Sequence, residues 1–512
     1  MKAAVATIVR NGMAQNGADL IVVSNREPYE HIWRRGHLAW QRTDGGLTSA
    51  LDRALRRLRG VWVAWGSGEA DRAAGDVIAV PPDDPSYRLR RVWLCPDDIA
   101  GGYVGYANQV LWPLCHLTLD RVEYRRAYWD AYRALNARFA DAVLQELRQQ
   151  PAPVWVHDFH LALLPGLIRE QAPDVPVSFF WHVPWPGPDA FRVLPERQAM
   201  LTGLLQADSI IFQTPGYARA FIACARQFLD ADVGPSGDAA PAGRAIAVNG
   251  HRCRVGVRGI GVDVESIATA AQAPRVAQTV AAIRRRLALR PGMRFGLGVD
   301  RLDYTKGLLK RLWAIDLFFT RHPEYRGALT FVQIAVPTRR DVETYRRYRK
   351  IIWETTIELN DRHTRGLDRQ VMREWQPVHL LEERVGFETL IAYYRHADFA
   401  LVSSVNDGMN LVAKEYVASR VDDDGVLLVS EMAGAAEQLR DAILINPYDT
   451  EGLADAIRQA LEMPLEERRR RMQALRASVQ RQDIHHWVEG CLTDAGFMRR
   501  RDAVSTLKEG RP

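Results

Sequence analysis

The stretch RFGLGVDRLDYTKG, residues 294–307, decides the fold class of this chain. Its first half is a short apolar run with the length of a buried β-strand, and its second half is a polar loop that ends in glycine. Short apolar runs of this kind recur on both sides of it. They are LIVVSN (20–25), VWVAWGS (61–67), VWVHD (154–158), VSFFWHV (177–183), SIIFQT (209–214), LTFVQIA (329–335), DFALVSS (398–404) and GVLLVS (425–430).

Amphipathic helical stretches separate these runs, for example residues 125–149, 387–396 and 450–461. Short buried strands that alternate with helices are typical of parallel sheets covered by helices on both faces. We therefore predict an α/β protein with two Rossmann-like domains facing each other across a cleft. The boundary is expected near GIGVD (259–263), and the last helical stretch, which includes DIHHW (483–487), is expected to cross back to the first domain.

The composition is that of an ordinary globular protein of 512 residues, 47% hydrophobic and 25% charged. No apolar run reaches the roughly 18 residues that a bilayer requires, and the N-terminus lacks the apolar region of a signal peptide, so we expect a cytoplasmic protein without a membrane partner. The five scattered cysteines are expected to be reduced thiols. The net charge of +6 is dispersed over the chain without a basic–aromatic module, which argues against a nucleic-acid partner.

Two cations in the opening stretch are the first candidate site. Arg301 and Lys306 lie in the loop that follows the apolar run, at the carboxyl edge of the predicted sheet. They suit a pyrophosphate, because a guanidinium offers a fork and an ammonium a point charge. Only six of the 68 basic residues are lysines, so a lysine inside a tight motif is informative. The alternative is a pair of ordinary surface charges.

The stretch SSVNDGMNLVAKEY (403–416) indicates a strand, a tight Asp-Gly turn and a helix. A helix N-terminus next to such a turn binds anions readily. Asp407 stands at the mouth of the loop and Glu415 two turns deeper, so the two could hold two sugars of one donor. Alternatively, Asp407 caps the helix and Glu415 is a surface residue. The acidic run 422–424 is interpreted as a turn and not as a metal site.

The first half of the chain also places polar residues at strand ends. Ser24-Asn25-Arg26 follows one strand, Gly45-Gly46-Leu47 opens a helix, and His157-Asp158 and His182 each end a strand. Trp65, Tyr103 and Trp112 add aromatic surface of the kind that flanks sugar rings, although any one of them taken alone is more often a core residue. Together the strand-end residues favour a functional site.

These segments, in this order, resemble glycosyltransferase family 20, the trehalose-6-phosphate synthases, from about residue 20 to 490. The resemblance rests on HDFHL…HVPWP, RLDYTKG, DGMNLVAKEY and GAAEQL…INPYD. It implies the GT-B fold, with an acceptor domain at 1–262, a nucleotide-sugar donor domain at 263–480, and a C-terminal helix and tail at 481–512. It also implies that no metal and no cofactor is required, since the nucleotide-sugar is a substrate.

The resemblance assigns roles to individual residues by matching motif. Catalytic roles fall on Asp158, His182, Arg301 and Lys306, the last two as the clamp on the donor pyrophosphate. Donor contacts fall on Gly46, Arg301, Lys306, Asp407, Gly408, Met409, Asn410, Leu411 and Glu415. Acceptor contacts fall on Arg26, Trp65, Tyr103, Trp112, Asp158 and Arg339, with Arg26 and Arg339 supplying the paired guanidiniums that a phosphate needs.

The implied reaction transfers glucose with retention from a nucleotide-glucose, UDP-glucose being favoured, to glucose 6-phosphate, giving α,α-trehalose 6-phosphate. The leaving phosphate takes the acceptor proton, so the enzyme needs charge stabilisation of the pyrophosphate and no carboxylate nucleophile. The family resemblance also implies a homo-oligomer, a dimer or a tetramer, and a role in osmoprotection.

Two alternatives remain open from the sequence. NREPYEH (25–31), and the long stretch between Arg26 and Gly45, look more like glucosylglycerol-phosphate synthases, which use glycerol 3-phosphate. The glycines at 45–46 and PTRRDV (337–342) favour glucose 6-phosphate instead. Asn406 also departs from the arginine usual before DGMN. A non-catalytic sugar-phosphate sensor is the other alternative, disfavoured because donor and acceptor residues are both present.

Overall fold

The computed structural model describes residues 20–43, 48, 51–52, 55–56, 60–234, 243–339, 342–368 and 375–498. The chain divides into two compact units. The first contains the residues up to Gly259 together with those from His485 onward, and the second is Ile260–Ile484. The expected divisions after residues 262 and 480 lie a few residues from these positions.

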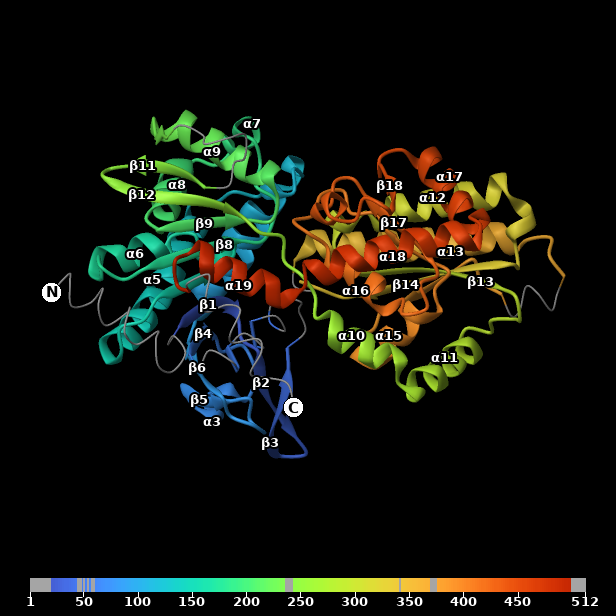
Figure 1. The fold of residues 1–512 in the computed structure, drawn as a ribbon, viewed down its shortest axis with the longest axis horizontal. Helices are drawn as coiled ribbons and strands as arrows, with labels where there is room; N and C mark the ends of the chain where they lie inside the picture. The colour runs from blue at the N-terminus through green and yellow to red at the C-terminus, as the bar shows by residue number, and fades with distance from the viewer. Residues whose placement is uncertain are drawn as a thin grey trace. The chain divides into compact units, whose positions relative to one another are not determined.

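The first unit is built on a mixed sheet with the strand order β10-β11-β12-β9-β8-β7-β1-β4-β6-β5 in the described part of the chain (Figure 1). Its strands are β1 (Ile21–Arg26), β4 (Val61–Trp65), β5 (Val77–Val80), β6 (Tyr87–Val92), β7 (Val154–His157), β8 (Val177–Trp181), β9 (Ser209–Phe212), β10 (Asp232–Val233), β11 (Arg244–Val248) and β12 (His251–Val257). The strands from β6 to β12 in this order run parallel. The order reverses between β1 and β7, which is the topological switch point where Rossmann-like sheets bind ligands.

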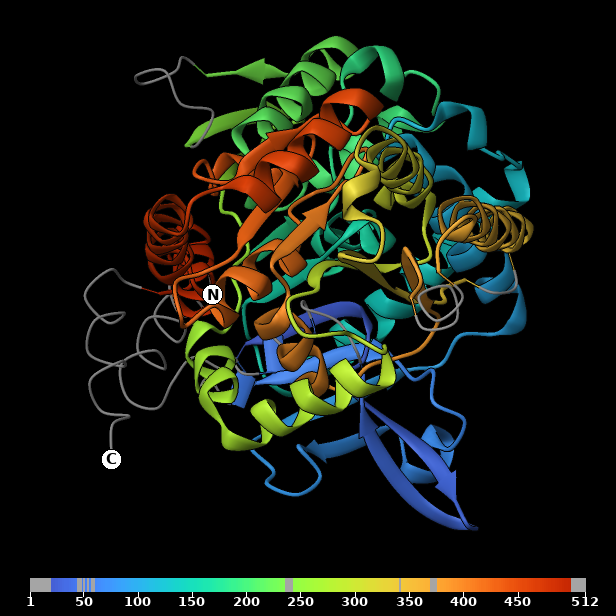
Figure 2. The same ribbon diagram turned by 90° about the vertical axis from the view of Figure 1, so that its right-hand side faces the viewer.

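Helices cover this sheet, and a separate hairpin, β2 (Tyr29–Arg34) with β3 (His37–Arg42), projects from it (Figure 2). The helical segments are α3 (Asp71–Ala74), the π-helix η1 (Asp98–Leu111), α4 (Trp112–Cys115), η2 (Leu119–Arg121), α5 (Arg126–Gln149), η3 (Phe159–Leu161), α6 (Leu164–Gln171), α7 (Pro188–Phe191), α8 (Arg197–Leu205), α9 (Pro215–Leu229) and α19 (Ile484–Asp494). α5 packs on β4 and β6, and α8 and α9 pack on β9 and β12. From His485 on, α19 belongs to the first unit.

The second unit is built on a parallel sheet with the strand order β15-β14-β13-β16-β17-β18. Its strands are β13 (Arg294–Arg301), β14 (Leu329–Val336), β15 (Val378–Leu381), β16 (Phe399–Val402), β17 (Val426–Ser430) and β18 (Ile443–Ile445). Numbered within the unit, this is the order 3-2-1-4-5-6 of a Rossmann fold, and its switch point lies between β13 and β16.

The helices of the second unit form layers on the two faces of its sheet (Figure 1). They are α10 (Val264–Gln272), α11 (Pro274–Arg286), η4 (Tyr304–Lys306), α12 (Leu308–Arg321), η5 (Pro323–Tyr325), α13 (Glu343–Thr364), α15 (Phe387–His396), α16 (Leu411–Ser419), η6 (Gly434–Glu437), α17 (Thr450–Glu462) and α18 (Leu465–Arg481). α12 packs against α13 and α17, whereas α16 packs against α10, α15 and α18. Within the described ranges, no helix is both long and apolar enough to span a bilayer.

The predicted α/β fold of two Rossmann-like units is confirmed, and each apolar run quoted above corresponds to a strand at nearly the predicted residues. The hairpin β2–β3 and the π-helix η1 were not predicted. In η1, the glycines at 101, 102 and 105 lie against Ala131 and Tyr128 of α5, where a Cβ would meet atoms at 2.6 to 2.9 Å. The sequence periodicity of a π-helix differs from the 3.6-residue period that identifies ordinary helices.

Candidate active site

The two segments singled out in the second half of the chain meet at the switch point of the second unit. Lys306, in the loop after β13, donates from Nζ to Oδ2 of Asp407, in the loop after β16, at 2.6 Å. The backbone joins the same loops, because the N–H of Val405 donates to the carbonyl of Thr305 at 2.9 Å. A cation and a carboxylate that are 101 residues apart in sequence are thus held as one partly buried pair.

Gly307 allows this approach. Its φ is +68°, in the left-handed region, and a Cβ on it would lie 2.0 Å from the carbonyl oxygen of Ser403. A backbone atom cannot move aside as the end of a flexible side chain can. Glycine is therefore required here both for the backbone conformation and for the close contact of the two loops.

Asp407 is held by more than Lys306. Its Oδ2 also accepts hydrogen bonds from Oγ of Ser404 at 3.0 Å and from Nδ2 of Asn410 at 3.1 Å. The interpretation of Asp407 as the cap of the following helix is wrong, because α16 begins at Leu411 and Asn410 caps it by accepting from the N–H of Ala413 at 3.1 Å. The carboxylate of Asp407 is therefore oriented by side chains and not used by the helix.

Asp303 is a functional candidate that sequence reasoning missed. It is fully buried and accepts from the N–H and Oγ of Thr305 at 3.1 and 3.0 Å. Burial by itself would raise its pKa, but the charges of Arg339, Arg301 and Lys306 outweigh burial and lower the pKa to about 2. The ionised carboxylate of Asp303 therefore interacts electrostatically with the three predicted substrate-binding cations of this unit.

Arg339 is bound to that anion directly. Its Nη1 donates to Oδ2 of Asp303 at 2.8 Å and to the hydroxyl of Tyr345, and its guanidinium lies 5.1 Å from the centre of the Tyr345 ring. Nη2 of Arg301 lies 4.0 Å from the same Oδ2 of Asp303. Arg339 belongs to the second unit and Arg26 to the first, so their joint phosphate pocket stays a prediction.

Glu415 lies in the second turn of α16 and accepts a hydrogen bond from the hydroxyl of Tyr394 at 2.9 Å. Burial raises the pKa of Glu415 to about 7, because the effect of burial is larger than the opposite effect of the Tyr394 hydrogen bond. Its charge therefore changes near neutral pH. The neighbouring residue, Lys414, is buried and donates to the carbonyl of Ile260, so only Glu415 of this pair is available to a ligand.

A buried ion pair between Arg311 and Asp300 lies beside the loops that carry Lys306 and Asp407. Arg311 of α12 donates from Nη1 to Oδ2 of Asp300 at 2.7 Å and from Nε to Oγ of Ser403 at 3.0 Å. Asp300 lies in β13 and Ser403 directly follows β16. The guanidinium therefore ties the ends of the two strands that flank the switch point.

In the first unit, Asp158 and His182 come together as predicted at the ends of neighbouring strands. Asp158 follows β7 with a φ of +73°, unusual for a residue with a side chain, and its Oδ1 accepts from the N–H of His182 at 3.3 Å. Nε2 of His182 lies 3.1 Å from Nδ1 of His157, and its Nδ1 lies 3.4 Å from Nε2 of Gln213. Burial lowers the pKa of His182 to about 3, so the imidazole is neutral.

The carboxyl end of β1 carries Asn25 and Arg26, and only Arg26 of these two has a role predicted from the sequence. Arg26 is exposed at the end of the strand. Asn25 is 4% exposed, yet neither its Oδ1 nor its Nδ2 has a hydrogen-bond partner among the described residues. Buried amides are normally satisfied, so an unsatisfied one at a switch point indicates a ligand contact.

The predicted aromatic residues differ in how deeply they are buried. The ring of Tyr103 contacts that of Trp65 with 5.3 Å between centres, and stacks with the ring of His160 at 5.7 Å. Only 6% of Trp112 is exposed, and its ring centre lies 5.8 Å from that of Phe159. Trp65 and Tyr103 therefore offer a joint aromatic surface, whereas Trp112 is mainly a core residue. Gly46 lies outside the described residues.

The NREPYEH stretch is largely structural. Glu27 is fully buried, and its Oε2 accepts from Nε of Arg91 at 2.9 Å. Nη2 of the same arginine lies 2.8 Å from Nδ1 of His31 and 2.9 Å from Oδ1 of Asp71. Tyr29 is also fully buried and donates to Asp52. These side chains therefore hold the hairpin β2–β3 on the sheet.

The acidic run 422–424 is likewise occupied by arginines. Asp422 accepts from Arg420, Asp423 from Arg476, and Asp424 from Arg468 at 2.6 Å. No group of three or more potential metal ligands occurs among the residues that the structure describes. The acidic run therefore holds α18 against the turn that precedes β17.

Comparisons with known proteins place the chain in one family. A model of glycosyltransferase family 20 matches residues 18–496. The UDP-forming alpha,alpha-trehalose-phosphate synthase of Schizosaccharomyces pombe is 36% identical over 463 residues, which cover 89% of this chain and 86% of the relative. The crystal structure of a UDP-forming alpha,alpha-trehalose-phosphate synthase from Burkholderia xenovorans in complex with glucose-6-phosphate has a TM-score of 0.83 and 28% identity, covering 93% of this chain and 100% of that chain. A structure from E. coli bound with UDP-2-fluoro glucose has a TM-score of 0.81 and 31% identity, covering 93% and 99%. The chain belongs to glycosyltransferase family 20.

Proposed function

We propose that this chain is a trehalose-phosphate synthase that transfers glucose from UDP-glucose to glucose 6-phosphate. The observation that carries the proposal is the Lys306–Asp407 pair at the switch point of the second unit, 2.6 Å across two loops. The relatives support both substrates, since one similar structure holds glucose-6-phosphate and another a UDP-glucose analogue.

The donor is proposed to bind to the second unit. Arg301 and Lys306 bind the pyrophosphate, because both cations lie at the carboxyl edge of the sheet beside the start of α16. Asp407, with the backbone from Gly408 to Leu411, binds the transferred glucose, and Glu415 binds the ribose. The buried anion Asp303 keeps the cations in place when no donor is bound.

The acceptor is proposed to contact the residues that the family resemblance assigns to it. Arg26 and Arg339 are each proposed to bind its phosphate, while Trp65 and Tyr103 line its sugar ring. Asp158 accepts a hydrogen bond from a sugar hydroxyl, and its strained backbone supports such a functional role. His182 adjoins the reacting carbon.

The proposed reaction proceeds with retention on one face of the glucose. The bond from C1 to the phosphate oxygen of UDP breaks, and the anomeric oxygen of glucose 6-phosphate bonds to C1 from the same side. The acceptor proton passes to the departing phosphate oxygen, so UDP and trehalose 6-phosphate are released. Lys306 and Arg301 stabilise the charge that develops on the phosphate. The mechanism requires no metal.

The packing role of the NREPYEH stretch favours glucose 6-phosphate over glycerol 3-phosphate as the acceptor, because it removes the main argument for glycerol 3-phosphate. Its Glu27, Tyr29 and His31 are engaged with Arg91 and Asp52 inside the unit. The stretch is therefore explained by packing of the hairpin and carries little information on the acceptor.

An acceptor competition tests the proposal. The purified chain is supplied with UDP-glucose and equal glucose 6-phosphate and glycerol 3-phosphate, with EDTA present, and the products are weighed by mass spectrometry. We expect a disaccharide phosphate. Glucosylglycerol phosphate as the product would show that the chain is a glucosylglycerol-phosphate synthase instead. A loss of product with EDTA would contradict metal independence.

Replacing Arg339 with alanine is expected to raise the KM for glucose 6-phosphate at least about tenfold and to leave the KM for UDP-glucose within about twofold, because its proposed partner is the acceptor phosphate. Asp303 keeps its hydrogen bonds from Thr305 in this variant, so the fold survives. Steady-state kinetics with each substrate varied in turn measure both constants. An equal rise in both would remove Arg339 from the acceptor site.

Donor affinity is expected to depend on pH through Glu415. Its pKa of about 7 means that the carboxylate is ionised above neutral pH and protonated below it. An ionised carboxylate binds ribose hydroxyls more strongly, so the KM for UDP-glucose should rise roughly fivefold as the pH falls through 7. Glu415→Gln should remove this dependence. A wild-type KM that is constant across neutral pH, or an unchanged slope in the variant, would contradict the ribose assignment.

Replacing Asn25 with alanine is expected to lower kcat/KM about tenfold with little loss of stability, because its side-chain amide has no hydrogen bond among the described residues. Asn136→Ala is the matched control. That buried amide donates to the carbonyls of Tyr132 and His160 and accepts from Leu163, so its loss should lower the unfolding free energy by about 2 kcal/mol. If Asn25→Ala behaves like the control, Asn25 is a structural residue.

The enzyme is further proposed to act in the cytoplasm as a homo-oligomer. All five cysteines are free thiols in the structure, which fits a reducing compartment. Light scattering of the purified chain would measure its mass, and a monomer at micromolar concentration would contradict the proposed assembly.

A further inference from the structure

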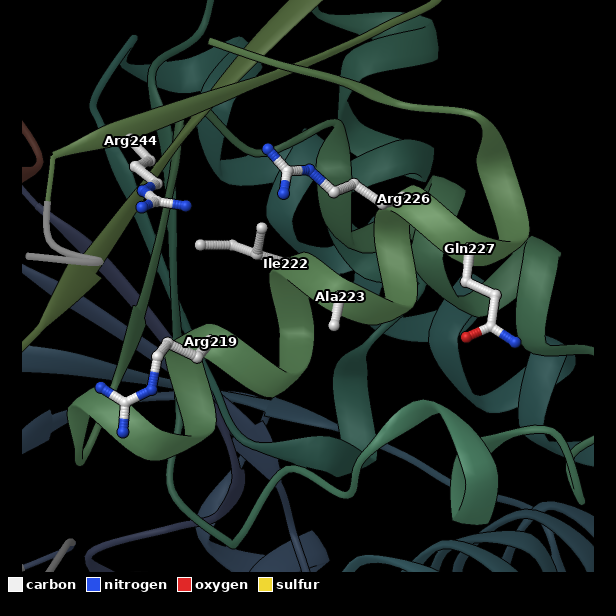
Figure 3. A pocket seen from close by; sticks show the side chains of 6 residues that line it. All are labelled: Arg219, Ile222, Ala223, Arg226, Gln227 and Arg244. Atoms are coloured by element: carbon white, nitrogen blue, oxygen red, sulfur yellow. The ribbon is translucent and has the colours of Figure 1, made fainter. Parts of the chain in front are cut away.

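A hollow on the first unit is lined by one helix face and the neighbouring edge of the sheet. Its volume is about 480 Å³. It is bounded by Arg219, Ile222, Ala223, Arg226 and Gln227 of α9 and by Arg244 of β11. Figure 3 shows the side chains of Arg226 and Arg244 extending toward each other over Ile222.

The charges around this hollow are unbalanced. Three of its six lining residues are arginines and none is acidic. Within the described residues, none of the three guanidiniums makes a hydrogen bond or an ion pair, and Nε of Arg244 is buried without a partner. Other arginines of the same unit are paired, such as Arg258 with Asp494 at 2.7 Å and Arg169 with Asp208 at 2.9 Å.

Within the first unit, the hollow lies apart from the strand end that carries Arg26. In the sheet order, β12, β9, β8 and β7 separate β11 from β1. At the usual spacing of neighbouring strands, five steps correspond to roughly 24 Å. A ligand in the hollow would therefore leave the switch point at β1 and β7 open.

We propose that this hollow binds a small phosphate monoester, at a site separate from those of the two substrates. A phosphate matches guanidinium forks in geometry and neutralises cations that have no counter-charge among the described residues. The volume lies within the range of roughly 300 to 1,000 Å³ that small-ligand pockets occupy. Ile222 and Ala223 give an apolar floor for the organic part of the ligand, and Gln227 gives a hydrogen-bonding group at its rim.

Hydrogen–deuterium exchange with inorganic phosphate as the probe tests the site locally. Millimolar phosphate is expected to slow exchange in peptides from α9 and β11 of the full chain, while chloride at matched ionic strength does not. The variants Arg226→Gln and Arg244→Gln should each weaken the apparent affinity of this response about tenfold. Arg252→Gln is the matched control, because Arg252 is exposed on β12 and does not line the hollow, and it should respond as the wild type does.

The KM values for UDP-glucose and glucose 6-phosphate should be unchanged in all three variants, which separates this site from the active site. An equal response to chloride would mean general screening of a basic surface and would overturn the proposal. Protection that persists in both Arg226→Gln and Arg244→Gln, or that is absent from the wild type, would also overturn it.

Discussion

Replacing Lys306 with alanine is expected to lower kcat about 10³-fold while the protein stays folded. The ammonium supplies a charge beside the leaving pyrophosphate, and removing one such preorganised group typically costs about 10² to 10³ in rate. The fold survives because Asp407 keeps its hydrogen bonds from Ser404 and Asn410. Initial rates at saturating UDP-glucose and glucose 6-phosphate, with circular dichroism of the same sample, measure both effects.

Two controls sharpen this prediction. Lys306→Arg keeps the charge but puts a planar fork where a compact ammonium sits 2.6 Å from a carboxylate, so it should also lose most activity. Lys310→Ala removes a lysine four residues further on, whose Nζ lies 4.1 Å from the centre of the Tyr448 ring, and should leave the rate unchanged. Full activity of Lys306→Ala would exclude Lys306 from the pyrophosphate clamp.

Gly307→Ala should lower the unfolding free energy by about 2 to 4 kcal/mol and abolish most activity. The new Cβ would lie 2.0 Å from the carbonyl oxygen of Ser403, and an alanine would be strained at a φ of +68°. To relieve the clash, the loop that carries Lys306 must move away from the loop that carries Asp407. Urea unfolding and initial rates of the variant measure the two losses.

Gly366→Ala separates backbone strain from the close contact. Gly366 has a φ of +82°, and nothing lies within 4 Å of the position that a Cβ would take. Its replacement should therefore cost only about 1 kcal/mol, from strain alone. If Gly307→Ala costs no more than Gly366→Ala, the contact with Ser403 does not constrain the loops.

The meeting of Lys306 with Asp407 was predictable from sequence. Both follow apolar runs, and the carboxyl ends of neighbouring parallel strands share one edge of a sheet. The same reasoning brought Asp158 next to His182. This prediction requires two pieces of information. The local apolar runs indicate where each strand ends, and their alternation with helices indicates that the strands are parallel.

The partners of individual charges were not predictable. Glu27 is held by Arg91, 64 residues further on, so nothing local in NREPYEH indicated that its acid is buried. Asp303 accepts from Arg339, which lies 36 residues further on, so nothing in the loop sequence distinguished Asp303 from its polar neighbours. Asn410 rather than Asp407 caps α16, because the left-handed backbone at Asn410, with a φ of +80°, delays the start of the helix to Leu411.

Proton NMR of the running reaction tests the central claim most directly. The chain is given UDP-α-glucose and glucose 6-phosphate, and the anomeric signals are followed together with the release of UDP. The account predicts α,α-linked trehalose 6-phosphate, one molecule for each UDP, and no such product from Lys306→Ala. A β-linked product, or UDP release with free glucose and no disaccharide phosphate, would contradict it.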